Sequence, residues 1–219
     1  MKNSSIIHSS PNIPSKDAVL KFLREKDLSE GKITHSIYVA ELALKISDEV
    51  IKDGIQVDKK IVEAGGLLHD VGLSGFGDKD LEEEIANPFP EHCVIGAKIA
   101  SDANFPDIVV ECIESHELWS ESEAKELGFP LPIKGDYIPK TWESKIVAYA
   151  DLVAFITALG YDLWKDPKAV IESSYVYRNR CFEKATGKSI GRDHPIIKRV
   201  DKFNNEMIKY LNQELIKKY

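Results

Sequence analysis

The sequence predicts an all-α protein, and three observations lead to this fold class. Several long segments repeat apolar residues at the three- and four-residue spacing of an amphipathic helix. Most of these segments follow a Ser, Thr, Asp or Pro that can begin a helix. No stretch of strand length alternates convincingly between apolar and polar residues. We therefore expect a helical bundle.

The first two helices are expected at residues 17–28 and 31–53. Ser15 can cap the first helix, and Gly54 is a natural stop for the second. The second helix carries a stripe of apolar and small side chains at alternating spacings of four and three, which indicates its core-facing side. This stripe consists of Ile33, Ile37, Ala40, Leu44, Ser47 and Ile51.

A third helix is expected at residues 59–72, opened by Asp58. The pair Gly65–Gly66 in its middle costs roughly 1 kcal/mol per glycine relative to alanine. Such a pair makes sense where another backbone approaches closely. After a glycine-rich loop, the acidic stretch 78–91 is expected to be a solvated surface segment or a mobile flap.

Five further helices are expected, at residues 92–103, 107–118, 142–159, 167–186 and 195–219. Three of them have a clear start: Pro106 suits the first helical position, and Thr141 and Asp193 can cap. The segment 120–139 is rich in proline and glycine around one short helix and therefore predicts a connection.

Composition excludes several classes of protein. A net charge of −7 and a pI near 5.5 argue against a nucleic-acid-binding surface. Three cysteines without a C-x-x-C pair indicate no disulfide framework and favour a reducing cytoplasm. The start of the chain lacks the apolar core of a secretory signal, and the most apolar stretch, 146–159, is too short to cross a bilayer. We expect a cytoplasmic protein without membrane contact.

Four of the six histidines form an ordered series with two aspartates, and each member lies in or beside a predicted helix. The series is His35, His69, Asp70, His92, His116 and Asp151. A single histidine of this kind is usually a core imidazole bonded to a neighbour. Burying the whole set unpaired would cost several kcal/mol for each group, and a bound cation is the usual compensation. The set predicts a metal site, since imidazole and carboxylate bind Zn, Fe, Mn or Ni.

Asp151 and the pair His69–Asp70 are the most specific members of this series. Asp151 is surrounded in sequence by apolar residues, so its carboxylate needs a cation or several donors to stay ionised. Adjacent helical residues diverge by ~100°, so His69 and Asp70 can face one centre only at a helix end, where the Gly72 turn places them. His92 and His116 lie at helix termini, where side chains from several helices can converge.

The series resembles the HD-domain superfamily of metal-dependent hydrolases, whose pattern is a His, then an adjacent His-Asp, then a distant Asp. The resemblance spans about Gly31 to Leu159, and His69-Asp70-Val71-Gly72 is similar to the HDIG variant of the motif. It implies one metal on His35, His69, Asp70 and Asp151. His92 and His116 match the further histidines of the two-metal subgroups, with Asp70 then bridging. The segment 117–151 is similar to an uncharacterised group of HDIG proteins.

One position departs from this pattern. Many HDIG phosphodiesterases have Lys directly after the Gly, and this chain has Leu73. Lys32, one helical turn before His35, matches a basic position of many HD proteins and is equally compatible with a plain surface lysine. Further candidates for phosphate binding are Lys145, Arg178 and Arg180.

From the resemblance we expect an HD-type helical domain at 16–165, after a flexible arm at 1–15 and before a helical extension at 166–219 packed on the same core. The expected function is metal-activated hydrolysis of a phosphate ester in a small nucleotide or phosphodiester. Two divalent ions are expected, Fe or Mn in preference to Zn, Ni, Co or Mg. Asp70 and Lys32 are the candidate catalytic residues, and a homodimer is possible. A di-iron oxygenase and a non-catalytic metal-stabilised sensor domain stay open as alternatives.

Overall fold

The computed structural model describes residues 12–78, 88–130, 135–160 and 168–211, together with positions 83, 163 and 166. Within these residues the secondary structure is helical, and the β-pairing consists of one isolated antiparallel bridge between Trp119 and Tyr137. The predicted all-α fold class is confirmed. Expectations about residues 1–11, most of the acidic stretch 78–91 and residues 212–219 lie outside the described residues.

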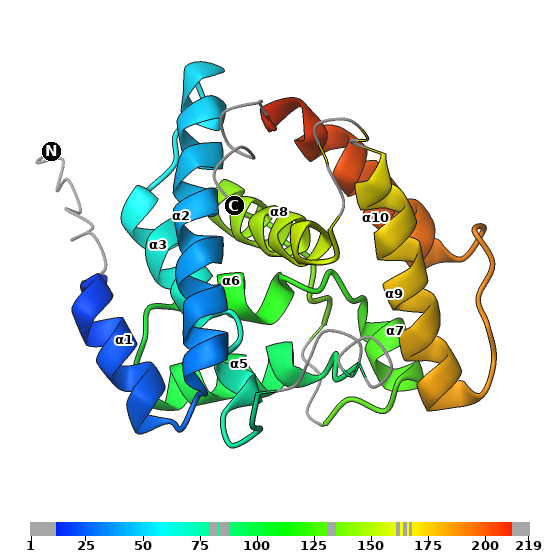
Figure 1. Ribbon diagram of the computed structural model, residues 1–219, viewed down its shortest axis with the longest axis horizontal. Coiled ribbons are helices and arrows are strands. Elements are labelled where there is room, and N and C mark those ends of the chain that lie inside the picture. Colours follow the sequence, from blue (N-terminus) through cyan, green and yellow to red (C-terminus); the bar gives the residue numbers. More distant parts are fainter. Residues whose placement is uncertain are drawn as a thin grey trace, which may run out of the picture.

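Figure 1 shows a helical bundle in which α8 lies centrally, α1, α2 and α3 lie on one side, and α9 and α10 lie on the other. The helices are α1 (Lys16–Glu25), α2 (Glu30–Lys52), α3 (Lys59–Leu68), α5 (His92–Asp102), α6 (Asp107–Ser115), α7 (Glu121–Glu126), α8 (Trp142–Ala158), α9 (Ala169–Thr186) and α10 (Pro195–Met207). Two short 3-10 helices are η1 (Val71–Leu73) and η2 (Ile208–Tyr210).

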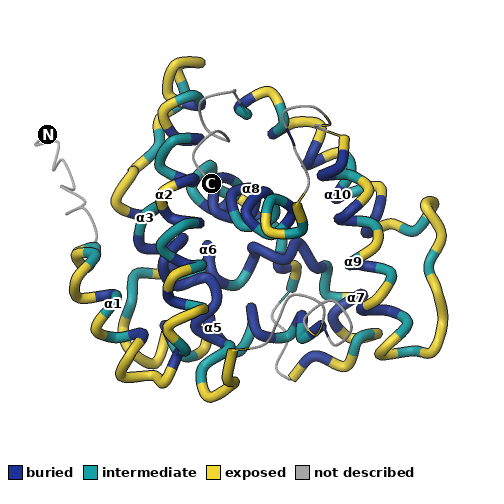
Figure 2. Tube along the Cα trace, in the orientation of Figure 1, coloured by how far each residue is buried: buried dark blue, intermediate teal, exposed yellow. Residues whose placement is uncertain are grey.

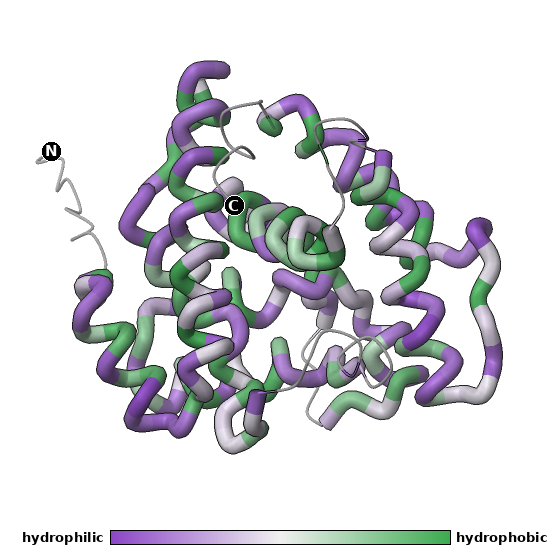
Figure 3. The backbone as a smooth tube through the Cα atoms, in the orientation of Figure 1, coloured by the Kyte–Doolittle hydropathy of each residue, from purple (hydrophilic) through white to green (hydrophobic). Residues whose placement is uncertain are grey.

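Helix α8 is the centre of the bundle because its sequence is apolar nearly all round. It packs against α2, α3, α6 and α9, and Figure 2 shows it among the most buried segments. The hydrophobic stretches in Figure 3 likewise gather on α8 and on the inner sides of the helices around it. Asp151 lies in the middle of this helix, so the packing of α8 places the Asp151 carboxylate inside the bundle.

The predicted stripe on α2 is partly wrong. Ile33, Ala40 and Ser47 are buried as expected, but Ile51 is 40% exposed, and Ile37 and Leu44 are only half-buried. The buried face follows instead the series Ile33, Ser36, Ala40, Ala43, Ser47 and Val50. Helix α2 packs against both α3 and α8, so its buried face is broader than one stripe and is rotated from the predicted one.

The glycine pair in α3 confirms the expected close approach. A Cβ on Gly65 would lie 2.7 Å from Cys112 Cβ in α6, and a Cβ on Gly66 would lie 2.8 Å from Ala40 Cα in α2. Helix α3 therefore sits tightly between α2 and α6, and His69 at its end is brought close to both helices.

Most predicted helix starts are correct. Ser15, Asp58 and Thr141 each accept a hydrogen bond from a backbone N–H of the first turn. Ser29 caps α2 in the same way, so the first helix ends earlier than residue 28. Pro106 is the N-cap of α6 and not its first helical residue, a shift of one position.

The predicted cap of the last helix is wrong. His194, not Asp193, caps α10, and its Nδ1 accepts from the Ile196 N–H at 3.4 Å. The carboxylate of Asp193 is fully exposed and pairs with Lys198 at 3.2 Å. His194 therefore has a structural role as the cap of α10.

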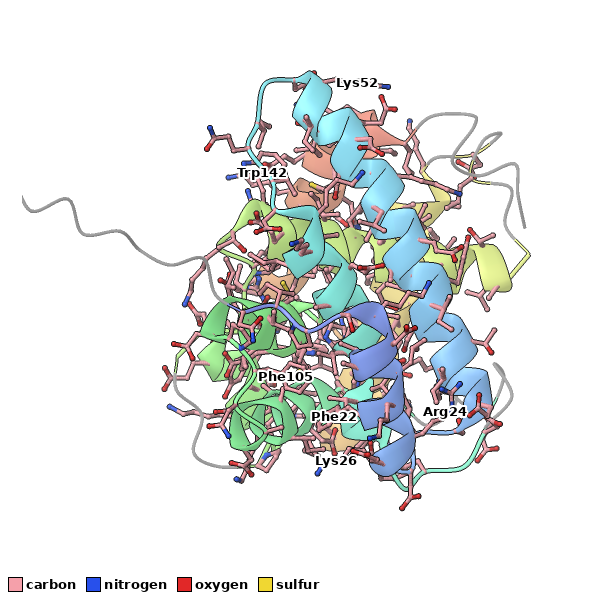
Figure 4. The ribbon with its side chains drawn as sticks, turned by 90° about the vertical axis from the view of Figure 1, so that its left-hand side faces the viewer. Phe22, Arg24, Lys26, Lys52, Phe105 and Trp142 are labelled. Atoms are coloured by element: carbon pink, nitrogen blue, oxygen red, sulfur yellow. The ribbon has the colours of Figure 1, made fainter. Side chains whose placement is uncertain are left out.

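Helix α1 closes the bundle beside α3. Figure 4 shows Phe22 beside Phe105 and Arg24 on the side nearer the start of α2. The two phenyl rings are 5.0 Å apart, edge to face, and Arg24 Nε donates to Glu30 Oε1 at 2.8 Å. Among the described residues, no helix is both long and apolar enough to cross a membrane.

Candidate metal centre

The six residues of the predicted metal site come together in the structure, although they belong to five different parts of the chain. His35 extends from α2, His69 and Asp70 follow α3, His92 begins α5, His116 follows α6 and Asp151 extends from α8. His69, Asp70, His92 and His116 are buried. The side chains of His35 and Asp151 are 27% and 21% exposed and form the more open side of the cluster.

The first half of the cluster surrounds one point with four side chains. The Oδ1 atom of Asp151 lies 3.1 Å from His35 Nε2 and 3.3 Å from His69 Nε2. The Oδ2 atom of Asp70 lies 3.4 Å from His69 Nε2 and 3.9 Å from His35 Nε2. Two imidazole nitrogens and two carboxylate oxygens thus face one another across a space suited to a single cation.

The second half of the cluster shares Asp70 with the first. Its other oxygen, Oδ1, lies 3.3 Å from His92 Nε2, and His92 Nε2 lies 2.9 Å from His116 Nε2. Ligand atoms of His35, His69 and Asp70 lie within 4.8 Å of one another, and so do those of Asp70, His92 and His116. Asp70 therefore presents one oxygen to each triad, which is the geometry of a bridging carboxylate.

Backbone carbonyls fix the tautomer of three of these histidines. In each one the Nδ1–H donates to the carbonyl three residues earlier, so in the neutral ring Nε2 carries the lone pair that can bind a metal. The pairs are His69 with Gly66 (2.8 Å), His92 with Phe89 (2.6 Å) and His116 with Ile113 (2.6 Å).

This arrangement fits divalent cations. The Nε2 atoms of His92 and His116 lie 2.9 Å apart, and because each ring already donates through Nδ1, a proton or a cation must lie between them. The Nε2 of His69 is buried without a hydrogen-bond partner. Metal ions can satisfy such a buried set of imidazole nitrogens and carboxylates by replacing the protons that the imidazoles otherwise hold, and its mixed N/O ligands suit Fe, Mn or Zn.

Electrostatics keeps the carboxylates ionised. Burial alone would raise the pKa values of Asp70 and Asp151, but the facing histidines lower both well below the usual range. Burial would lower the pKa of His69, but Asp70 and Asp151 outweigh it and raise this pKa well above 6.5. Burial and the neighbouring His92 and His69 lower the pKa of His116 to about 4, so its imidazole is neutral at pH 7.

A cavity of about 520 Å³ opens beside the cluster. Five of the six candidate ligands reach its wall, all except His69. Much of the remaining wall is apolar: Leu73, Phe76, Leu118, Leu152, Phe155 and Val200. Ser174, Tyr177 and Arg178 of α9 and Val200 of α10 complete it, so the last two helices contribute directly to the cavity.

The two lysines proposed for phosphate binding differ in their position relative to the cavity. Lys32 is half-buried and lines the cavity one turn before His35, and Leu73 lines it as well. Lys145 does not line the cavity: its Nζ lies 3.2 Å from Glu206 Oε1 and 4.9 Å from the centre of the Trp142 ring. The prediction that Lys145 binds substrate is not supported, because a residue at the start of α8 faces α10.

The two arginines of α9 also differ. Arg180 is exposed and pairs with Glu183 at 3.4 Å, outside the cavity. Arg178 lines the cavity but is buried, forms an ion pair with Glu117, and stacks 4.5 Å from the centre of the Trp119 ring. Its charge is therefore neutralised by protein, and it is a weaker candidate for binding phosphate than the sequence suggested.

Sequence reasoning missed Glu117 and Tyr177. Both line the cavity, and the Tyr177 hydroxyl donates to Glu117 Oε1 at 3.2 Å. Burial would raise the pKa of Glu117, but Arg178, His92 and His116 lower it. The sequence signal that could have identified Glu117 as a site residue is its position directly after His116.

The three cysteines are free and buried. Burial raises the pKa of Cys93 and of Cys112, so both thiols stay protonated. Cys93 and Cys112 are small buried residues of the core, although each is close in sequence to a candidate ligand.

Comparison with known families identifies the class of this site. The family model of the HD domain matches residues 33–156, and the chain belongs to the HD-domain family. The predicted resemblance is therefore confirmed, and its expected span, Gly31 to Leu159, agrees closely with the match. The family implies divalent metal binding, which agrees with the donor set described above.

Curated relatives cover the chain to different extents. An uncharacterised protein of Methanocaldococcus jannaschii is 33% identical over 181 residues, covering 82% of this chain and 89% of the relative. A tRNA (cytidine(56)-2'-O)-methyltransferase of Picrophilus torridus is 35% identical over 142 residues, 64% of this chain and 36% of the relative. Ribonuclease Y of Mycoplasma capricolum is 39% identical over 96 residues, 44% of this chain and 16% of the relative.

Among solved structures, the chain is similar to the HD domain of the L. monocytogenes phosphodiesterase PgpH in complex with cyclic-di-AMP. The TM-score is 0.47 with 20% identity, over 89% of this chain and 95% of that chain.

Proposed function

We propose that this protein is a metal-dependent hydrolase of phosphate esters with two divalent cations, iron or manganese, at the centre. One cation would be held by His35, His69, Asp70 and Asp151, and the other by Asp70, His92 and His116. The observation that carries the proposal is the cluster of buried acceptors with three histidine tautomers fixed by backbone carbonyls. Membership of the HD-domain family and similarity to a ribonuclease support it.

The chemistry of such a centre suits a phosphate ester. Two divalent cations held by these residues would lower the pKa of a bound water toward neutrality and would neutralise charge on phosphoryl oxygens. The residues around the cavity complement this task. Asp70 offers one oxygen to each triad, and its lowered pKa keeps it ionised. Lys32 lies on the cavity wall one turn from His35, where its ammonium can contact the non-reacting oxygens of a phosphate.

The size and charge of the cavity favour a small-molecule substrate. About 520 Å³ is in the range of single-ligand sites. The chain carries a net charge of −7, which would repel an anionic polymer such as RNA. The relatives described above include no oxygenase, and no observation favours the di-iron oxygenase or the sensor domain. A homodimer stays a prediction.

A substrate screen tests this proposal. Protein loaded with Mn²⁺ or Fe²⁺ is incubated with phosphomonoesters, nucleotides, cyclic dinucleotides and a short RNA, and the products are separated by chromatography. We expect hydrolysis of at least one small phosphate ester, and its loss in His92→Ala. Hydrolysis of RNA alone would refute the small-molecule assignment. No hydrolysis of any substrate, with oxygen uptake by the iron form, would refute the hydrolase.

A further inference from the structure

The chain turns sharply after α6 at residues 116–118, here called the corner. This segment carries His116 and is held in a strained conformation. Leu118, two residues after His116, has φ of +56°, a left-handed value that costs a non-glycine residue conformational energy. Its N–H donates to Ser115 O at 3.0 Å. Residues in this conformation persist where surrounding contacts hold them, so the corner requires external support.

Helix α10 supplies part of that support. The guanidinium of Arg199 donates to the carbonyl of Leu118 from Nε at 3.2 Å and from Nη2 at 3.0 Å. The same guanidinium pairs with the buried Glu123 of α7. Two hydrogen bonds from the charged guanidinium of Arg199 thereby connect the backbone of the corner to α10.

Helix α9 holds the corner from a second direction. Glu117, adjacent to His116, receives Arg178 at Oε2 and the Tyr177 hydroxyl at Oε1. Arg178 is 5% exposed, and its guanidinium carbon lies 4.5 Å from the centre of the Trp119 ring and 5.1 Å from that of the Tyr177 ring. Both oxygens of Glu117 are therefore occupied, and the two donors fix the position of this carboxylate. Because burying two charges costs desolvation energy, the ion pair itself is weak evidence for added stability.

Both supports come from outside the matched family domain. The HD match ends at residue 156, and Tyr177, Arg178 and Arg199 lie beyond it. Within the cluster, the corner carries His116 of the second triad. Of the first cation site, His35 and Asp151 lie on α2 and α8, and His69 directly follows α3.

We propose that Arg178 is a positioning residue for the second cation: through Glu117 it orients the corner so that His116 Nε2 faces His92 Nε2. The C-terminal helices would thereby control occupancy of the second site and leave the first largely unaffected. This inference rests on the two-cation centre of the proposed function, and deepens it by assigning a role to residues outside the family domain.

Titration with Mn²⁺ alone tests this inference, without any substrate. Chelator-treated protein is titrated by calorimetry, and its electron paramagnetic resonance spectrum is recorded to detect an exchange-coupled manganese pair. In Arg178→Met we expect the second Mn²⁺ to bind at least about tenfold more weakly, the coupled signal to be lost, and the first Mn²⁺ to bind within twofold of wild type. Arg178→Lys should restore part of the second affinity because it keeps a cation beside Glu117.

Two further variants separate positioning from folding. Arg178→Met leaves the Glu117 carboxylate buried and unpaired, so the double variant Glu117→Gln with Arg178→Met provides a form without that charge. It should fold and still bind the second Mn²⁺ weakly. Arg180→Met, two residues along α9 and exposed, is the matched control and should bind both ions as wild type does.

Three outcomes would overturn the inference: unchanged binding of both ions in Arg178→Met, equal weakening of both ions in the double variant, or a wild-type protein that binds only one Mn²⁺. A wild-type protein that binds two ions but hydrolyses no phosphate ester would refute the proposed function alone, and the titration would still decide the role of Arg178.

Discussion

The backbone of Gly72 packs directly against that of His92. A Cβ built on Gly72 would lie 2.0 Å from the carbonyl oxygen of His92 and 2.7 Å from the backbone nitrogen of Gly96. This contact joins η1 to α5 and brings Asp70 within 3.3 Å of His92. The glycine of the His-Asp-Val-Gly motif is therefore explained by close packing between the two halves of the metal centre.

Gly72→Ala should destabilise the fold by about 2–3 kcal/mol, because the added methyl overlaps backbone atoms that cannot move aside. Urea denaturation of chelator-treated protein measures this loss. Gly77→Ala is the matched control, since a Cβ there meets no atom within 4 Å. Equal stability of the two variants would contradict the packing argument.

Asp151→Asn should keep the helical fold and lose at least about tenfold in affinity for one cation. The amide has the same shape, but it removes the negative charge that faces His35 and His69 at 3.1 and 3.3 Å. Circular dichroism and elemental analysis of the purified variant measure the two effects. Asp102→Asn, an exposed change in α5, should alter neither. Full metal content in Asp151→Asn would remove this residue from the ligand set.

Lys32→Ala should lower kcat/KM for a phosphate ester by roughly tenfold, about 1.4 kcal/mol, with metal content unchanged. The reason is its position on the cavity wall. Lys32→Arg should recover much of the activity because a guanidinium also binds phosphate oxygens. Lys145→Ala should leave the kinetics unaltered, since Lys145 pairs with Glu206 outside the cavity. The opposite ranking would move the phosphate site toward α10.

Binding of a cation should release a proton from His69 at pH 7. Asp70 and Asp151 hold the pKa of His69 above 6.5 despite its burial, so the metal-stripped protein carries an imidazolium there. Metal and proton compete for Nε2, and affinity should therefore rise with pH, by up to about tenfold per unit, until the pH passes this pKa. Calorimetry in buffers of different ionisation enthalpy counts the protons released. A count of zero would contradict the raised pKa.

The same shift has a consequence for the metal-stripped fold. A histidine whose pKa is raised by folding stabilises the folded state at pH values below its unfolded pKa, near 6.5. That contribution disappears as the pH rises through the raised value. Chelation should therefore destabilise the protein more at pH 9 than at pH 6, as measured by thermal unfolding.

Much of the site could be predicted because the type and order of its residues indicate their chemistry. His69–Asp70 at a helix end, and a lone carboxylate at Asp151 in an apolar helix, indicated a metal before any geometry was known. Cation candidates could not be ranked in the same way. Lys32, Lys145 and Arg178 look alike in sequence, and each lies on a helix whose facing partner is set by the tertiary fold.

The helices, most of their caps and the identity of the candidate ligands follow from the sequence, because periodicity, capping and ligand chemistry are local properties. Three relationships became known only from the packing of the helices: Asp70 presents one oxygen to each triad, Arg178 forms an ion pair with Glu117, and α9 and α10 contact the corner that carries His116. These relationships join residues far apart in the chain. They depend on how helices pack, and helical periodicity indicates which face of a helix is buried but not which neighbour covers it.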